Sequence, residues 1–146
     1  MNSELIDDAY PLSPMQQGML FHSLSSREPG VDIEQILCTL HEEINVPASE
    51  RAWQRVVERH DILRTSFRWE GLDAPLQKVH PGVRVPFETK DWRGLPEQEW
   101  RNRLEDFLAA DRRRGFDLAV APLMRLVLIR TGEAEHQLVW TFHHLL

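Results

Sequence analysis

The stretch Trp140-Thr141-Phe142-His143-His144-Leu145-Leu146 ends the chain and organises the rest of it. Its aromatic and β-branched residues predict a strand that delivers two adjacent histidines. Neighbouring side chains of a strand point to opposite faces, so we expect one histidine to line a cavity and the other to be buried or solvated elsewhere. The same alternation argues against one metal held by both, and no cysteine or carboxylate cluster offers further ligands at zinc spacing.

This stretch belongs to a predicted strand pair near the centre of a sheet. We expect strands at 123–130 and 136–144, joined by a turn at Thr131-Gly132-Glu133. The run Leu126-Val127-Leu128-Ile129 is apolar on both faces, which is typical of a central strand covered by helices. The earlier part of the chain must supply those helices.

Three helices are expected. The first has a sharp start, with Ser13 as N-cap, Pro14 at the first helical position and Gln16 completing a capping box. Its expected apolar face consists of Met15, Met19, Leu20 and Leu24, with Gly18 allowing close approach of a neighbour. The other helices are expected at 47–60 and 96–114, and the remaining strands at 31–44, 66–69, 76–79 and 83–89. This order predicts an α+β fold, a mixed α/β sandwich.

The composition places the chain among ordinary globular domains. Its 146 residues, 42% hydrophobic and 27% charged, suffice for one domain with a real core. The net charge of -6 and the lack of a Lys/Arg stripe give no reason to expect nucleic acid. No apolar stretch approaches the roughly 18 residues of a membrane span. The first residues do not resemble a signal peptide, and the single Cys38 favours a reducing compartment, so we expect a soluble, cytoplasmic protein.

Two further stretches could carry chemistry beside the histidines. In 59–67, Arg64 is either part of a basic helix end or aimed inward at a carboxylate between Leu63 and Phe67. In the first helix, His22 follows the polar pair at 16–17 and is as readily a surface or core histidine as a ligand. None of these stretches alone decides a function.

Together they resemble a known family. The segments Tyr10-Pro-Leu-Ser-Pro-Met-Gln-Gln-Gly-Met-Leu-Phe-His22, Arg59-His-Asp-Ile-Leu-Arg-Thr-Ser-Phe67 and His143-His144 are similar to the first three signature motifs of condensation domains from nonribosomal peptide synthetases, in the right order. Gly115-Phe116-Asp117-Leu118 and Pro122-Leu123-Met124-Arg125 resemble the lead-in to the third motif. The resemblance covers essentially the whole chain. It implies the N-terminal lobe of a two-lobed fold of the chloramphenicol acetyltransferase-like superfamily.

The resemblance also implies a reaction and its residues. Such domains join an acyl or peptidyl thioester to the amine of an aminoacyl thioester, both carried on phosphopantetheine arms of carrier proteins. No metal or redox cofactor is implied. His144 corresponds to the catalytic histidine, His143 to a mostly structural one, and Arg64 to an arginine that supports the histidine loop through an aspartate.

That aspartate belongs to the family motif His-His-x-x-x-Asp-Gly, of which the chain contains only His143 to Leu146. We therefore expect residues 1–146 to be an N-terminal lobe cut within this motif and inactive without the C-terminal lobe. Arg64 is then expected to turn to solvent or to another acid, because an unpaired buried charge costs several kcal/mol. Leu145, Leu146 and the first helix are expected to expose apolar surface and promote self-association.

Three alternatives remain open. Heterocyclisation domains carry aspartates in place of the histidines, which disfavours that relative. Epimerisation domains keep the histidines, but their first motif usually differs from the form found here. A module that only docks carrier proteins, without catalysis, is the alternative of a different class.

Overall fold

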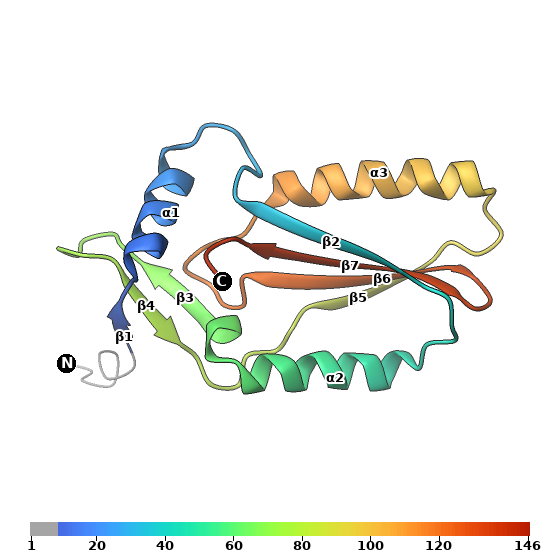
Figure 1. Ribbon diagram of the computed structural model, residues 1–146, viewed down its shortest axis with the longest axis horizontal. Coiled ribbons are helices and arrows are strands. Elements are labelled where there is room, and N and C mark those ends of the chain that lie inside the picture. Colours follow the sequence, from blue (N-terminus) through green and yellow to red (C-terminus); the bar gives the residue numbers. More distant parts are fainter. Residues whose placement is uncertain (1–8) are drawn as a thin grey trace.

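The computed structural model describes residues 9–146 and contains two sheets and three α-helices (Figure 1). A four-stranded sheet has the order β2-β7-β6-β5, and a three-stranded sheet has the order β1-β4-β3. The strands are β1 (Ala9–Pro11), β2 (Ile33–Leu40), β3 (Thr65–Arg68), β4 (Leu76–Val79), β5 (Phe87–Asp91), β6 (Met124–Gly132) and β7 (Glu135–His143). The helices are α1 (Pro14–Ser25), α2 (Val46–Arg59) and α3 (Glu97–Arg114), and a short 3-10 helix, η2, spans Asp61–Arg64. The expected α+β fold is confirmed.

The four-stranded sheet has α3 on one face and α2 on the other (Figure 1). Strand β6 lies between β7, with which it is antiparallel, and β5, with which it is parallel. Leu126 packs with Val57 of α2, while Val127 and Ile129 pack with Trp100 of α3. Both faces of β6 are therefore buried, as the apolar run in the sequence predicted.

The helix ends follow the sequence closely. The hydroxyl of Ser13 accepts a hydrogen bond from the backbone N–H of Gln16 (3.1 Å), whose side chain accepts from the N–H of Ser13 (2.9 Å). Asn45 caps α2 through its side-chain oxygen, which accepts from the N–H of Ala48 (3.0 Å). Gly115 ends α3 with a positive φ of 59°. Caps are local interactions, which is why the capping box of α1 could be predicted; the Asn45 cap of α2 was not predicted.

The predicted apolar face of α1 is wrong in two of its four members, since Met19 and Leu20 pack against the core but the other two do not. Leu20 is buried, but Met15 is 86% exposed and Leu24 is also exposed. A Cβ placed at Gly18 would meet no described residue within 4 Å, so Gly18 serves no close approach. Only the narrow line of α1 that faces Phe67 is covered, because periodicity identifies an apolar face and not what packs on it.

The largest differences between observed and predicted strand bounds are in β2 and β5. β2 is shorter at both ends than the expected 31–44, and β5 begins at Phe87 rather than at 83. The side chain of Gln54 in α2 explains the second difference: it donates to the carbonyl of Val83 (2.7 Å) and accepts from the N–H of Val85 (3.0 Å). A glutamine thus takes the hydrogen bonds that a neighbouring strand would have made.

Two short elements were not predicted, namely β1 and η2. β1 begins at Ala9, the first residue that the structure describes. Among residues 9–146, no helix is both long enough and apolar enough to cross a bilayer.

Candidate active site

The two histidines lie at the end of β7 in different environments. His143 is the last residue of the strand and is buried, whereas His144 follows in a turn and is exposed. The chain ends beside α1 and β3, so the histidines lie where the two sheets meet (Figure 1). The alternation predicted from the sequence is therefore observed.

The ring of His143 makes two hydrogen bonds. Its Nδ1 accepts from the backbone N–H of Leu145 (3.0 Å), and its Nε2 lies 3.2 Å from the hydroxyl of Ser23. Because an amide N–H can only donate, Nδ1 must be unprotonated and Nε2 carries the hydrogen of the neutral ring. Burial lowers the pKa of His143, and the nearby Asp32 carboxylate opposes this only in part. The ring is a neutral structural element rather than an acid.

His144 is held by its main chain and leaves its side chain accessible. Its backbone N–H donates to the carbonyl of Asp32 (2.9 Å), which ties the turn to the start of β2. Its Nδ1 lies 3.6 Å from a carboxylate oxygen of Glu34, and both of these side chains are exposed. A histidine whose backbone is anchored and whose ring is exposed is suited to contact a reactant.

Arg64 lies at the end of η2 and binds a different part of the molecule. Its guanidinium donates to the carbonyls of Val57 (3.1 Å) and His80 (3.0 Å) and forms an ion pair with Asp61. Arg64 therefore finds another acid, as expected, while the inward-facing carboxylate of the alternative interpretation is not among its partners in residues 9–146. These bonds join the end of α2 to the end of β4. None of these bonds reaches His143 or His144.

The first-helix candidates separate into two places. Gln16 exchanges side-chain hydrogen bonds with Gln77 of β4 (2.9 and 3.1 Å) and serves the junction between α1 and the small sheet. His22 is exposed, and its Nδ1 lies 3.1 Å from both carboxylate oxygens of Asp32. His22 is thus brought to the same carboxylate that supports the histidine motif.

Sequence reasoning missed a buried ion pair between Arg125 of β6 and Asp111 of α3. The Arg125 guanidinium donates to the Asp111 carboxylate (2.7 Å), to the Asp111 carbonyl (2.6 Å) and to the Gly115 carbonyl (2.7 Å). The other carboxylate oxygen accepts from the Thr141 hydroxyl (2.6 Å). A charged residue in the apolar run 123–129 was the available signal, because a charge there needs a buried partner.

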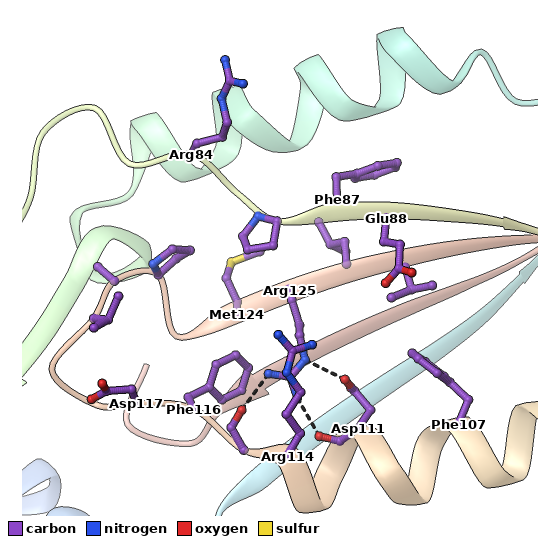
Figure 2. Close-up of a pocket in the computed structure, with 17 residues that line it drawn as sticks. Arg84, Phe87, Glu88, Phe107, Asp111, Arg114, Phe116, Asp117, Met124 and Arg125 are labelled. Carbon is purple, nitrogen blue, oxygen red and sulfur yellow. Dashed lines mark hydrogen bonds and ion pairs between the residues drawn. The ribbon is translucent and has the colours of Figure 1, made fainter.

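This pair borders a pocket of about 740 Å³ between α3, β5 and the start of β6. Figure 2 shows the Arg125 guanidinium between the Phe116 ring and Asp111, with Arg114 in front of it. Phe116 lies 4.2 Å from the guanidinium carbon, at cation–π distance. Neither histidine lines this pocket. A second pocket, of about 460 Å³, has Ser23, Asp32 and His143 in its wall.

No metal centre accompanies the histidines in the part of the chain that the structure describes. No group of three or more histidine, cysteine, aspartate or glutamate side chains in residues 9–146 is arranged to hold an ion. The site presents the accessible imidazole of His144 beside the buried ring of His143, in a hydrogen-bonded turn.

A family model described as Condensation domain matches residues 6–146. The chain belongs to the condensation domain family. It is 50% identical over 141 residues to a subunit of linear gramicidin synthase from Brevibacillus parabrevis, and 40% identical over 141 residues to bacitracin synthase 3 from Bacillus licheniformis. Each alignment covers 97% of this chain but only 2% of the relative, so the chain spans a small part of such proteins.

Solved structures agree on the fold. A variant of the starter condensation domain of rhizomide synthetase RzmA, in complex with C8-CoA, superposes with a TM-score of 0.83 at 18% identity, covering 94% of this chain and 31% of that one. The EpoB cyclization-docking bidomain from Sorangium cellulosum gives a TM-score of 0.77 at 25% identity, covering 94% and 27%. The chain thus has a fold that is found within such domains, and it spans less than a third of each of these two chains.

Proposed function

We propose that residues 1–146 form the N-terminal lobe of a condensation domain that makes amide bonds in a nonribosomal peptide synthetase. The donor is an acyl or peptidyl thioester on one carrier protein, and the acceptor is the amine of an aminoacyl thioester on another. The observation that carries this proposal is the exposed ring of His144 directly after the buried His143. The family match and the synthase relatives support it.

In this proposal, the acceptor nitrogen attacks the thioester carbonyl carbon. The carbon–sulfur bond breaks and the nitrogen loses a proton. With that proton, the sulfur leaves as the thiol of the phosphopantetheine arm. His144 either takes that proton or holds the amine in line. General-base help is typically worth about 10²–10⁴-fold, whereas positioning supplies effective molarities of about 10⁵–10⁸ M. Positioning contributes the larger share of the rate acceleration, because a neutral amine is already nucleophilic.

His143 and Arg64 have supporting roles in this proposal. His143, neutral and buried, fixes the turn through the N–H of Leu145. Arg64 fixes the junction of α2 and β4. Substrates arrive on phosphopantetheine arms of carrier proteins, so the lobe itself needs no bound cofactor for this step.

The test joins this chain to the remaining part of the condensation domain of its 50%-identical relative, and supplies loaded donor and acceptor carrier proteins. We expect the fusion to form the amide product, and His144→Ala to reduce the rate by about 10²-fold or more. His41 is the matched control, because it is also exposed and lies 3.7 Å from a carboxylate, that of Glu135. His41→Ala should keep the rate. A folded fusion without product would contradict the proposed activity, and an active His144→Ala variant would remove His144 from it.

A docking function without catalysis has its own supporting observation. Met15, Phe21 and Leu24 give α1 an exposed apolar surface, which is the kind of surface that finds partners. We also propose that the 146-residue chain is inactive alone and self-associates through this surface. Leu145 cannot contribute as first expected, because it is buried against the core beside Leu12 and Leu123. Light scattering that finds a monomer at high micromolar concentration would contradict self-association, and carrier binding without turnover by the fusion would favour docking.

A further inference from the structure

Three polar residues from distant parts of the chain meet beside the histidine motif. Ser23 lies in the last turn of α1, Asp32 directly precedes β2, and His143 ends β7. The Ser23 hydroxyl is hydrogen-bonded to the Asp32 carboxylate and lies 3.2 Å from Nε2 of His143. Asp32 and His143 are buried and Ser23 is half-buried. A buried cluster of this kind must satisfy its polar groups internally.

The directions of these hydrogen bonds follow from one main-chain contact. The N–H of Leu145 occupies Nδ1 of His143 as a donor, so the neutral ring carries its hydrogen on Nε2 and donates it to the Ser23 hydroxyl. The hydroxyl hydrogen is then free to go to Asp32, whose carboxylate can only accept. The chain of donors therefore runs from Leu145 and His143 through Ser23 to Asp32.

This direction separates the cluster from a nucleophilic triad of the same three residue types. In such a triad the carboxylate accepts from Nδ1–H, and the unprotonated Nε2 accepts the serine proton. Here Nε2 is protonated and the carboxylate binds the serine instead. The His143 ring therefore cannot act as the base for Ser23, and the cluster orients groups rather than attacking a substrate.

Asp32 holds the histidine motif a second time through its backbone. Its carbonyl accepts from the N–H of His144 (2.9 Å), while its side chain reaches the ring of His143 through Ser23. Burial by itself would raise the pKa of Asp32, but the hydrogen bonds from Ser23 and His22 outweigh it and lower the pKa. The carboxylate therefore stays ionised at neutral pH and keeps its role as an acceptor.

We propose that Asp32 and Ser23 are positioning residues that fix the direction in which the His144 side chain points from the turn after β7. This inference rests on the proposed role of His144 in amide formation. Asp32 fixes the main chain of His144, and Ser23 fixes the preceding ring and, through Nδ1 of that ring, the N–H of Leu145. The turn carrying His144 is thus held on both sides of that residue.

The first test does not depend on activity. Long-range ¹H–¹⁵N spectra of the histidine rings in the 146-residue chain should show His143 as the Nε2–H tautomer, with this hydrogen protected from exchange. Ser23→Ala should remove the protection, and Ser23→Thr should restore it by returning the hydroxyl. Ser25→Ala is the matched control, because Ser25 also lies near the end of α1 but bonds to the Phe21 carbonyl of its own helix. An Nδ1–H tautomer in the wild type, or exchange protection unchanged by Ser23→Ala, would contradict the proposed hydrogen bond from His143 to Ser23.

The second test measures positioning in the fusion with the remaining part of the domain. Ser23→Ala and Asp32→Ala should lower kcat by about 10- to 100-fold, since small misplacements of a catalytic group have effects of this size, with the KM for the carrier proteins unchanged. Ser23→Thr should recover kcat. Loss of protection with an unchanged kcat would overturn the positioning role. A folded wild-type fusion without product would count against the proposed function alone, and the spectra would still decide the cluster.

Discussion

Arg125 and Arg64 are two arginines with ion-pair partners, and the molecule treats them differently. The side chain of Arg125 is 8% exposed and that of its partner Asp111 is 4% exposed. Arg64 is 15% exposed, but its partner Asp61 is 72% exposed. The buried arginine faces a buried carboxylate, while the guanidinium at the end of η2 is held mainly by the carbonyls of Val57 and His80.

The contribution of an ion pair to stability depends on how far both charges are removed from water. In the Arg125–Asp111 pair both charges have left water, so each depends on the other and on further hydrogen bonds. Thr141 and Gln35 supply such bonds to the free carboxylate oxygen of Asp111 (2.6 and 3.3 Å). In the Arg64 site the carboxylate of Asp61 remains exposed to water. The guanidinium is held mainly by its hydrogen bonds to two neutral backbone carbonyls. We expect large effects at the first site and small electrostatic effects at the second.

The largest effect is expected from Arg125→Met, which keeps an unbranched apolar stem and leaves Asp111 buried without its cation. Breaking a buried pair from one side costs about 3–5 kcal/mol, and we expect a loss of this size in the free energy of unfolding measured with urea. Replacing both residues, Arg125→Met with Asp111→Leu, should recover much of the loss. A single-variant loss below about 1 kcal/mol would contradict the buried pair.

Arg64→Met should have the next largest effect. It leaves the carbonyls of Val57 and His80 without their donors, and an unsatisfied buried polar group costs about 1–3 kcal/mol. Arg68→Met is a suitable control, because Arg68 is an exposed arginine on the neighbouring strand β3. Equal losses in urea unfolding for the two variants would show that the carbonyl contacts of Arg64 contribute nothing specific.

Thr141→Val tests the hydrogen bonds around the buried pair. The substitution keeps the shape of the side chain and removes one donor from Asp111, which retains Arg125 and Gln35. A loss of about 1 kcal/mol is expected. In the Arg125→Met background the loss should differ from this value, because residues of one network do not act additively. Strict additivity in this double-mutant cycle would separate Thr141 from the network.

Asp61→Asn should have the smallest effect. An ion pair whose acid is exposed contributes about 0–1 kcal/mol, and the backbone contacts of Arg64 remain. The small loss should shrink further in high salt, because exposed charges are screened. A loss comparable to that of Arg64→Met would mean that the charge of Asp61, and not the carbonyls, holds the arginine.

The sequence predicted those features that depend on neighbouring residues. The capping box at Ser13, the stop of α3 at Gly115 and the two-sided burial of β6 were all visible in local patterns. Opposite environments of His143 and His144 were expected from strand alternation, although His144 lies in the turn after β7. The three motifs also identified the family, since three ordered matches are far more specific than one.

Features that join distant segments could not be predicted in this way. The Asp111–Arg125 pair and the contact of Ser23 with His143 link different elements, and no local pattern identifies the partner in either contact. The start of β5 was missed because a glutamine 29 residues from Val83 replaced its strand partner. The exposed face of α1 was missed because apolar periodicity does not tell which residues are covered.

The pairing of β2 with β7 has a consequence for how the protein is made. The register joins Ile33 to His143 and Leu40 to His136, so every partner of β2 lies about 100 residues later in the chain. At a synthesis rate of about 5–20 residues per second, β2 leaves the ribosome roughly 5–20 s before the strand that completes it. Such long-range pairing also slows folding after release. The turn that carries His144 can therefore take its final shape only after β7 has been made, because its anchor is Asp32, the residue that precedes β2.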